Sequence, residues 1–234
     1  MSLSTLQPGY RALVLGSSGA IGAAFVAALQ ADSACAEVVG ASRRDDARLD
    51  WLRPDDAQVA LAEWAALGPW DVVIDATGAL TIGGVGPDKR MHDWAPEALT
   101  RQWQVNAMGP ALAMRVLMPS LAKGRRVIYA KLSARVGSIE DNHKGGWAAY
   151  RSAKAALNQF LQTATIELAR QRPLAVVAAL QPGTVASDLS APFVSADQAL
   201  SPARSVAGLL SALDGLETTG RAHFVDHRGQ AIAW

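Results

Sequence analysis

The chain has 234 residues, of which 50% are hydrophobic and 18% charged, and its formal net charge at neutral pH is +1. This composition is typical of a globular protein and excludes a disordered one, and the near-zero charge gives no indication of a nucleic-acid or anionic membrane partner. A single cysteine, Cys35, excludes an intramolecular disulfide, and neither a membrane-spanning apolar run nor a signal-peptide pattern is present, so we expect a cytoplasmic protein.

The first predicted elements form a phosphate-binding unit. A short apolar strand at 12–15 runs into the glycine-rich stretch Gly16–Gly22, and a helix follows over 23–30. Glycines allow the backbone to turn sharply and to approach a pyrophosphate, and a helix N-terminus offers amide donors and the positive end of its dipole. We therefore favour a dinucleotide-binding loop over a plain turn. Its candidate cofactor contacts are Gly16, Ser18, Ile21 and Gly22.

The end of the second predicted strand, over 37–44, bears on which dinucleotide would bind. In dinucleotide folds an acidic residue at this position holds the free ribose 2′-hydroxyl, whereas an arginine accommodates a 2′-phosphate. Here the strand ends in Ser42, Arg43 and Arg44, with no carboxylate before Asp45. Because a guanidinium suits a phosphate, Ser42 and Arg43 favour NADP(H) over NAD(H), the alternative being that the arginines are only solvated.

The remaining elements alternate between strands and helices. Further strands are predicted at 47–50, 70–76, 126–132, 174–180 and 222–225, and helices at 54–66, 96–122, 150–168 and 202–213. The span 80–96 is expected to be a surface loop, and Pro110 is expected to kink the second of these helices just past Asn106. The alternation predicts one Rossmann-type domain over 1–234, a doubly wound parallel sheet in a three-layer α/β/α sandwich. Ligands in such sheets lie beyond the carboxyl ends of the strands, where Gly16, Gly78, Ser133 and Gly183 fall.

Tyr150 and Lys154 are four residues apart at the start of a long helical pattern, so both project from one face of the helix. An ammonium beside a phenol favours the phenolate, which would lower the tyrosine pKa from its ordinary value of about 10. A tyrosine of this kind can pass a proton to or from a substrate oxygen. The alternative is a surface tyrosine and lysine at helical spacing, which the rest of the chain disfavours.

Together these motifs resemble the short-chain dehydrogenase/reductase family, in particular its C-factor-like and Sniffer-like branch, which is related to carbonyl reductases. The resemblance extends over essentially the whole chain. The matching stretches are Gly16–Gly22, Asn106–Pro110, Leu132–Ile139, Tyr150–Lys154 and Pro182–Val185, and the branch is indicated by Leu189–Phe193 and Ile232–Trp234.

The resemblance implies a catalytic tetrad of Asn106, Ser133, Tyr150 and Lys154 that acts on a small carbonyl or alcohol substrate with NADP(H). Tyr150 would protonate the carbonyl oxygen as hydride arrives at its carbon, and Ser133 would hydrogen-bond the same oxygen. Lys154 would also bind the nicotinamide ribose, and Asn106 would hold a water that links Lys154 to solvent. Further implied cofactor contacts are Asp50, Gly78, Tyr150, Lys154, Pro182, Gly183, Thr184 and Val185.

Three stretches depart from the family's pattern. Ala20 stands where the loop usually has a glycine. Asp75 and the residue after it replace two asparagines, so contact with the cofactor there would be mainly through the backbone. Counting back from Gly137 places Ala134 rather than Ser133 at the family's serine position, and both remain candidates.

The sequence also bears on partners. Small residues lie on more than one face of the helices around Asn106 and Tyr150, and the resembling family pairs these helices across a two-fold axis, so we expect a homodimer or homotetramer. Trp147, Leu189 and Phe193 are candidates for an apolar substrate pocket. The four histidines show no metal-ligand grouping, so no metal is predicted.

A second class of function stays open at this point. The C-factor branch is associated with intercellular signalling, so a cofactor-binding signalling or regulatory protein with little turnover is the alternative to an enzyme. The four residues of the implied tetrad favour the enzyme, because a sensor need not keep them together.

Overall fold

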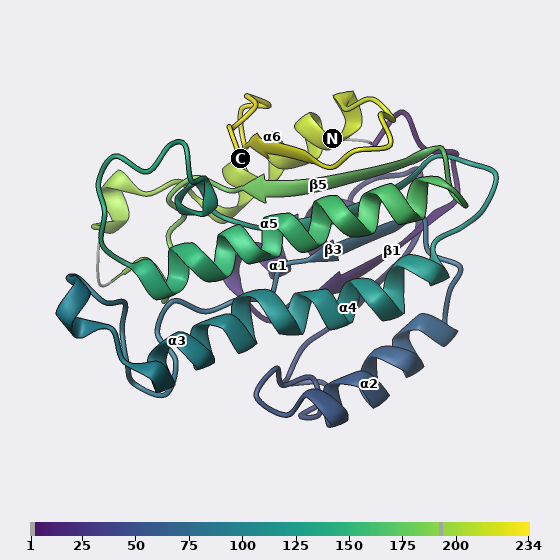
Figure 1. The fold of residues 1–234 in the computed structure, drawn as a ribbon. Helices are drawn as coiled ribbons and strands as arrows, with labels where there is room; N and C mark the ends of the chain where they lie inside the picture. The colour runs from purple at the N-terminus through teal and green to yellow at the C-terminus, as the bar shows by residue number, and fades with distance from the viewer. Residues whose placement is uncertain (1–2, 192–193) are drawn as a thin grey trace.

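A parallel sheet forms the centre of the protein. The structure, a computed structural model, describes residues 3–191 and 194–234. Within them the strands are β1 Tyr10–Leu15, β2 Cys35–Ala41, β3 Val72–Asp75, β4 Val127–Leu132, β5 Ala175–Gln181 and β6 His223–Asp226. They are ordered β2-β1-β3-β4-β5-β6 and each neighbouring pair is parallel (Figure 1). The chain therefore has the predicted doubly wound sheet, with the strand order reversing between β1 and β3, which is where such sheets bind ligands.

Helices cover both faces of this sheet. They are α1 Ala20–Gln30, α2 Pro54–Ala66, α3 Pro96–Trp103, α4 Gly109–Leu117, α5 Ala148–Ala169 and α6 Pro202–Gly215. On one face α1 and α6 pack against the sheet through residues such as Phe25 and Leu209. On the other face α2, α4 and α5 pack through residues such as Leu61, Leu117 and Leu157. The central strands are buried from both sides, as their continuous apolar sequences require.

The strand predicted at 47–50 is wrong. These residues lie in turns, in which the amide of Leu49 donates to Asp46 (3.0 Å) and the amide of Asp50 donates to Arg48 (2.7 Å). The Arg48 guanidinium pairs with Asp46 (2.7 Å) and with Glu63 of α2, so it lies away from the sheet. A short run rich in Asp and Arg offers no apolar face to bury, and β2 remains the edge strand.

The helix predicted over 96–122 is interrupted rather than simply kinked. α3 is followed by a wide π-helical turn, Gln104–Met108, and then by α4 and a short 3-10 helix, Met118–Ser120. Pro110 has no amide hydrogen, so it cannot donate to the carbonyl of Asn106 as an α-helical residue would. The widened turn contains Asn106 itself, and turns of this kind are frequent at functional sites.

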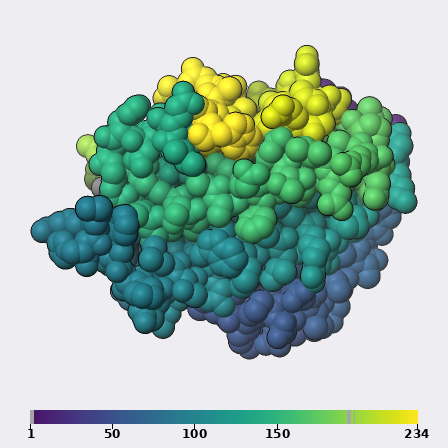
Figure 2. All heavy atoms as spheres, viewed as in Figure 1, coloured from purple at the N-terminus to yellow at the C-terminus, as the bar shows by residue number. Residues whose placement is uncertain are grey.

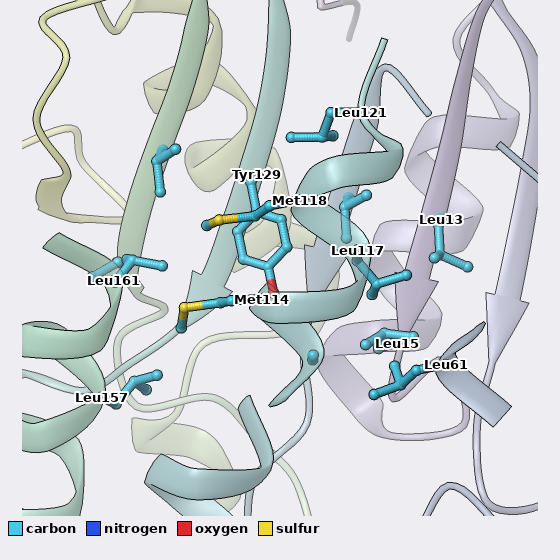
Figure 3. Packing of buried hydrophobic residues seen from close by; sticks show 14 of the residues in the cluster. Leu13, Leu15, Leu61, Met114, Leu117, Met118, Leu121, Tyr129, Leu157 and Leu161 are labelled. Atoms are coloured by element: carbon cyan, nitrogen blue, oxygen red, sulfur yellow. The ribbon is translucent and has the colours of Figure 1, made fainter. Parts of the chain in front are cut away.

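A tyrosine of the sheet is buried in the layer on the α4 and α5 side. Tyr129 of β4 is fully buried, and Figure 3 shows it among Met114, Leu117 and Met118. Its hydroxyl has no hydrogen-bond partner among the described residues. In the space-filling view α4 and α5 form a band across this face, from one end of which the segment around the 3-10 helix Met91–Asp93 projects (Figure 2).

No helix in the described ranges is both long and apolar enough to span a membrane. The other short 3-10 helices are Arg135–Gly137, which follows β4, and Ala196–Gln198, which precedes α6.

Candidate active site

The glycine loop after β1 packs closely against the end of β3. Gly16 has a φ of +77°, and a Cβ built on it would lie 3.0 Å from the carbonyl carbon of Ala76. A Cβ built on Gly22 would lie 2.1 Å from the carbonyl oxygen of Gly16. Only glycine fits either position, so the loop folds back onto the first turn of α1. This closeness brings the N-terminus of α1 to the carboxyl edge of the sheet, the arrangement that binds phosphates.

A cavity of about 390 Å³, called here the Arg43 cavity, lies beside this loop. It is lined by Gly16, Ser18, Ser42, Arg43, Asp50 and Gly78 among others, so six predicted cofactor contacts share one hollow. The Ser42 hydroxyl donates to Asp45 (2.7 Å). The Arg43 side chain is exposed and makes no hydrogen bond or ion pair with any residue that the structure describes.

A second cavity of about 300 Å³, the Tyr150 cavity, adjoins the first. The two share the turn Ala76–Gly78 after β3. Its lining includes the predicted residues Ile21, Ser133, Tyr150, Lys154 and Pro182–Val185. Gly22 and Asn106 line neither cavity: Gly22 packs inside the loop and Asn106 is buried beneath the shared turn.

Tyr150 and Lys154 come from the first two turns of α5 and are both buried. The Lys154 Nζ lies 5.6 Å from the centroid of the Tyr150 ring and donates to the carbonyl of Leu132 (3.1 Å). Burial raises the pKa of the Tyr150 phenol above its ordinary value. Burial also lowers the pKa of Lys154 well below its usual range, with the nearby Lys131 ammonium adding to the effect and Asp75 opposing it. The direction of the Tyr150 pKa shift is therefore opposite to the predicted one, because burial penalises the charged phenolate.

Ser133 lines the Tyr150 cavity, but its hydroxyl has a partner of its own. It donates to the Oδ1 of Asn158 (2.7 Å), which lies one turn beyond Lys154 on α5. A hydroxyl has one hydrogen to donate, so in this geometry Ser133 does not offer it to a ligand. Ala134 lines the same cavity with its methyl group.

Asn106 forms hydrogen bonds with the loop that follows the shared turn. Its Oδ1 accepts from the amide of Ala79 (3.1 Å), and its Nδ2 donates to the carbonyl of Ala79 (2.8 Å) and to Gln102 (2.7 Å). A Cβ built on Gly78 would lie 3.1 Å from the Asn106 Oδ1 and 3.5 Å from the Lys154 Nζ. Gly78 of the shared turn therefore packs closely against Asn106 and Lys154.

Residues 47–198, more than half of the chain, match the family described as short chain dehydrogenase. The chain belongs to the short-chain dehydrogenase family. It is 33% identical over 175 residues to C-signal of Myxococcus xanthus, an alignment that covers 75% of this chain and 99% of that protein. The resemblance seen in the sequence motifs is confirmed.

Solved structures of this family have the same fold. The carbonyl reductase Sniffer of D. melanogaster superposes with a TM-score of 0.79 at 20% identity, covering 97% of this chain and 99% of that one. The NADPH-bound carbonyl reductase from chicken fatty liver superposes with a TM-score of 0.78 at 19% identity, covering 98% of this chain and 95% of that one.

Two features of this short-chain dehydrogenase were not predicted. Asp88, in the loop before α3, accepts hydrogen bonds on its carboxylate from the amides of Ala148 and Ala149 (2.7 and 2.9 Å), and its carbonyl accepts from Trp147 (2.7 Å). This clamp holds Trp147 at a φ of +56°, with its ring edge-on to Tyr150 at a centroid distance of 6.5 Å. Sequence reasoning missed it because Asp88 lies some sixty residues before the helix that it caps.

The second unpredicted feature is Lys131, a fully buried lysine in β4 that pairs with Asp75 at 3.0 Å. A charge in the middle of an apolar strand was the available signal. Of the residues proposed for the apolar pocket, Trp147 and Leu189 line the Tyr150 cavity, and Phe193 lies outside the described residues. The described part of the chain contains no group of three side chains that could hold a metal ion.

Proposed function

We propose that this short-chain dehydrogenase is an NADP(H)-dependent oxidoreductase that interconverts a carbonyl compound and its alcohol, with Tyr150 as the proton donor and acceptor. The observation that carries the proposal is that the two cavities adjoin at one turn. The glycine loop and Arg43 lie at one end, Tyr150 and Lys154 lie at the other, and the turn Ala76–Gly78 forms a common wall.

The residues fit a dinucleotide. The close packing at Gly16 and Gly22 brings backbone amides to the place where a pyrophosphate would lie, and the unpaired Arg43 guanidinium is available to a 2′-phosphate. The segment Pro182–Val185 and Ile21 would enclose the nicotinamide beside Tyr150. The bound nicotinamide would supply the hydride chemistry.

The proton chemistry would belong to the protein. A buried phenol with a raised pKa stays protonated at neutral pH, so Tyr150 can donate its proton to an oxygen on which negative charge develops. Lys154 lies close enough to stabilise the phenolate that remains. The side chains of Leu80, Val136, Trp147 and Leu189 make the cavity wall largely apolar, so the favoured substrates carry apolar groups on the carbonyl carbon.

The direct test is the oxidation of NADPH, followed by absorbance, against a panel of aldehydes and ketones that differ in size and polarity. Turnover with apolar carbonyl compounds is expected. Binding of NADPH without turnover on any member of the panel or on the matching alcohols with NADP would contradict the proposal.

A second function is favoured by one observation, the 33% identity with C-signal over 99% of that protein's length. A signalling protein of this fold would bind a dinucleotide and act through a partner. It would predict that a variant without turnover keeps its biological effect, whereas the enzyme hypothesis predicts that the effect is lost with Tyr150→Phe.

Cofactor choice gives a separate prediction. Arg43→Ala is expected to weaken NADPH binding by about 10- to 100-fold and to leave NADH binding nearly unchanged, because a charge-assisted hydrogen bond contributes about 1.5–3 kcal/mol. Dissociation constants for both cofactors measure it. Arg44→Ala is the matched control, since Arg44 is also exposed but does not line the cavity. Equal loss in both variants, or equal affinity of the wild-type protein for NADH and NADPH, would refute a phosphate contact at Arg43.

The roles of Ser133 and Ala134 can be separated by two substitutions. Because the Ser133 hydroxyl already donates to Asn158, Ser133→Ala is expected to lower kcat by less than about tenfold, a small effect beside the 10²–10³-fold cost of removing a true oxyanion donor. Ala134→Ser, which adds a hydroxyl to the cavity wall, is expected to raise kcat. A loss in Ser133→Ala as large as that in Tyr150→Phe would instead make Ser133 the donor to the substrate oxygen.

The assembly prediction concerns the face formed by α4 and α5. Phe160 and Ile166 of α5 are 38% and 46% exposed, and Trp103 of α3 contacts the Phe160 ring at a centroid distance of 6.5 Å. Apolar side chains exposed on one face are typical of a self-complementary two-fold interface. Light scattering is expected to give a particle of at least twice the chain mass of 24.6 kDa. A monomer that persists at micromolar concentration would refute the proposed homodimer or homotetramer.

A further inference from the structure

The ion pair between Asp75 and Lys131 is unusual in its burial. Asp75 ends β3 and Lys131 lies opposite it in β4, and both side chains are 0% exposed at a separation of 3.0 Å. Removing two charges from water is costly, and an ion pair in a core is weak evidence for stability. Lysine is almost never fully buried unless it is paired. The position of the pair in the fold therefore calls for a reason other than stability.

The two side chains hold the turn that follows β3. The Lys131 Nζ donates to the carbonyl of Thr77 (2.6 Å), to its hydroxyl (3.2 Å) and to the carbonyl of Asp75 (3.3 Å). The Asp75 Oδ1 accepts from the Thr77 amide (2.9 Å) and from the Thr77 hydroxyl (2.6 Å). With the Asp75 Oδ1 (3.0 Å) the ammonium has four acceptors for its three hydrogens, so its whole capacity is used on Asp75 and Thr77. Thr77 is fixed through its amide, its carbonyl and its side chain.

That turn is the shared wall of the Arg43 and Tyr150 cavities. On one side the Gly16 backbone packs so closely against Ala76 and Thr77 that a Cβ on Gly16 would lie 3.0–3.1 Å from their backbone atoms. On the other side Gly78 lies against Asn106 and the Lys154 Nζ. A displacement of the turn would therefore change the shape of both cavities, the Arg43 cavity beside the glycine loop and the Tyr150 cavity beside Lys154.

We propose that Asp75 and Lys131 are positioning residues for the active site, which hold the Ala76–Gly78 turn in the place where it lines both the Arg43 cavity and the Tyr150 cavity. The proposal rests on the function proposed above. It extends that function, because neither side chain lines a cavity: both act through the backbone of the turn.

The test compares four variants of the full chain: Asp75→Asn, Lys131→Gln, the double variant Asp75→Asn/Lys131→Gln, and Asp71→Asn as matched control. Asp71 directly precedes β3, at the opposite end from the groove, and its buried carboxylate pairs with Arg125 at 2.6 Å. The double variant leaves no charge buried without a partner, so it keeps the comparison possible if a single variant does not fold.

The first readout needs no cofactor. The amide of Ala79 donates to Asn106 and contacts neither member of the pair, so its hydrogen exchange reports the position of the turn. Exchange is expected to be at least about tenfold faster than wild type in both single variants, and unchanged in Asp71→Asn, beyond any change that global stability explains.

One further readout uses the cofactor. The NADPH dissociation constant is expected to rise by about tenfold or more in the single variants, to recover largely in the double variant, and to stay unchanged in Asp71→Asn.

Ala79 exchange that follows global stability in all four variants, with the NADPH affinity of the folded protein unchanged, would overturn the positioning role. Failure of the wild-type protein to bind NADPH would count against the proposed function, and the Ala79 exchange rates would still decide the role of the pair.

Discussion

Replacing Tyr150 with phenylalanine is expected to lower kcat for carbonyl reduction by about 10²–10⁴-fold while the NADPH dissociation constant stays within about twofold of wild type. The change removes one oxygen and keeps the ring, which packs edge-on against Trp147 at a centroid distance of 6.5 Å. The loss falls on turnover because the hydroxyl is the proton donor in the proposed reaction, whereas the groove that holds the cofactor is unaltered. Stopped-flow or steady-state NADPH oxidation gives kcat, and a fluorescence titration gives the dissociation constant.

Tyr129→Phe is the matched control for this prediction. It removes the same atom from a tyrosine that is fully buried in the core, where the hydroxyl has no hydrogen-bond partner (Figure 3). No catalytic effect is expected, and stability should be unchanged or slightly higher because an unsatisfied polar group is removed. A Tyr150→Phe enzyme as active as Tyr129→Phe would show that another group transfers the proton.

The order of the fold was predictable because it depends on local patterns. The strands β1, β3, β4 and β5 are short and largely apolar runs, whose length favours a buried parallel strand over a helix. The helix over 54–66 was predicted to the residue, since Pro54 starts it and its apolar spacing continues to Ala66. The strand prediction at 47–50 was wrong because the conformation of these residues depends on the ion pair of Arg48 with Glu63. The sequence does not show that contact.

Site residues that line the Arg43 and Tyr150 cavities were predictable from the sequence. Lys131, which lines neither cavity, was not. Gly16, Arg43, Tyr150 and Lys154 lie within motifs whose spacing carries their chemistry. Lys131 could not be read in this way, because its role depends on register: only the pairing of β3 with β4 places it opposite Asp75. The sequence shows the departure from the family's pattern at Asp75 and the charged Lys131 in β4. It does not show that the two side chains form an ion pair.

The predicted direction of the Tyr150 pKa shift was wrong, and the reason is physical. A lysine four residues from a tyrosine suggests a lowered phenol pKa, yet α5 buries both side chains, and burial penalises the charged form of each. The Ser133 side chain is buried as well, and its hydroxyl donates to Asn158, one turn beyond Lys154 on α5. Helical spacing shows which side chains share a face, but the solvent exclusion that decides their protonation follows from packing.

The largest structural effect is expected from Gly22→Ala. A Cβ at this position would lie 2.1 Å from the carbonyl oxygen of Gly16, 2.7 Å from its carbonyl carbon and 3.1 Å from the Cα of Ser17. All three atoms belong to the backbone, so no side chain can move aside, and the loop must open or α1 must shift. Overpacking of this kind costs about 1–3 kcal/mol of the free energy of unfolding. Because the loop is the proposed pyrophosphate site, NADPH affinity is expected to fall by more than about 100-fold, which corresponds to the loss of about 2.7 kcal/mol of binding free energy.

Gly19→Ala is the control that separates this clash from the mere addition of a methyl group to the loop. Its Cβ would meet the Gly16 oxygen at 3.4 Å, an ordinary contact, and Gly19 has a φ of −81°, which alanine adopts without strain. Thermal unfolding and NADPH titration of the two variants are the measurements. The expected order is a small change for Gly19→Ala and a large loss of both stability and affinity for Gly22→Ala. If Gly22→Ala binds NADPH as well as Gly19→Ala does, then the close return of the loop onto α1 is not what forms the phosphate site.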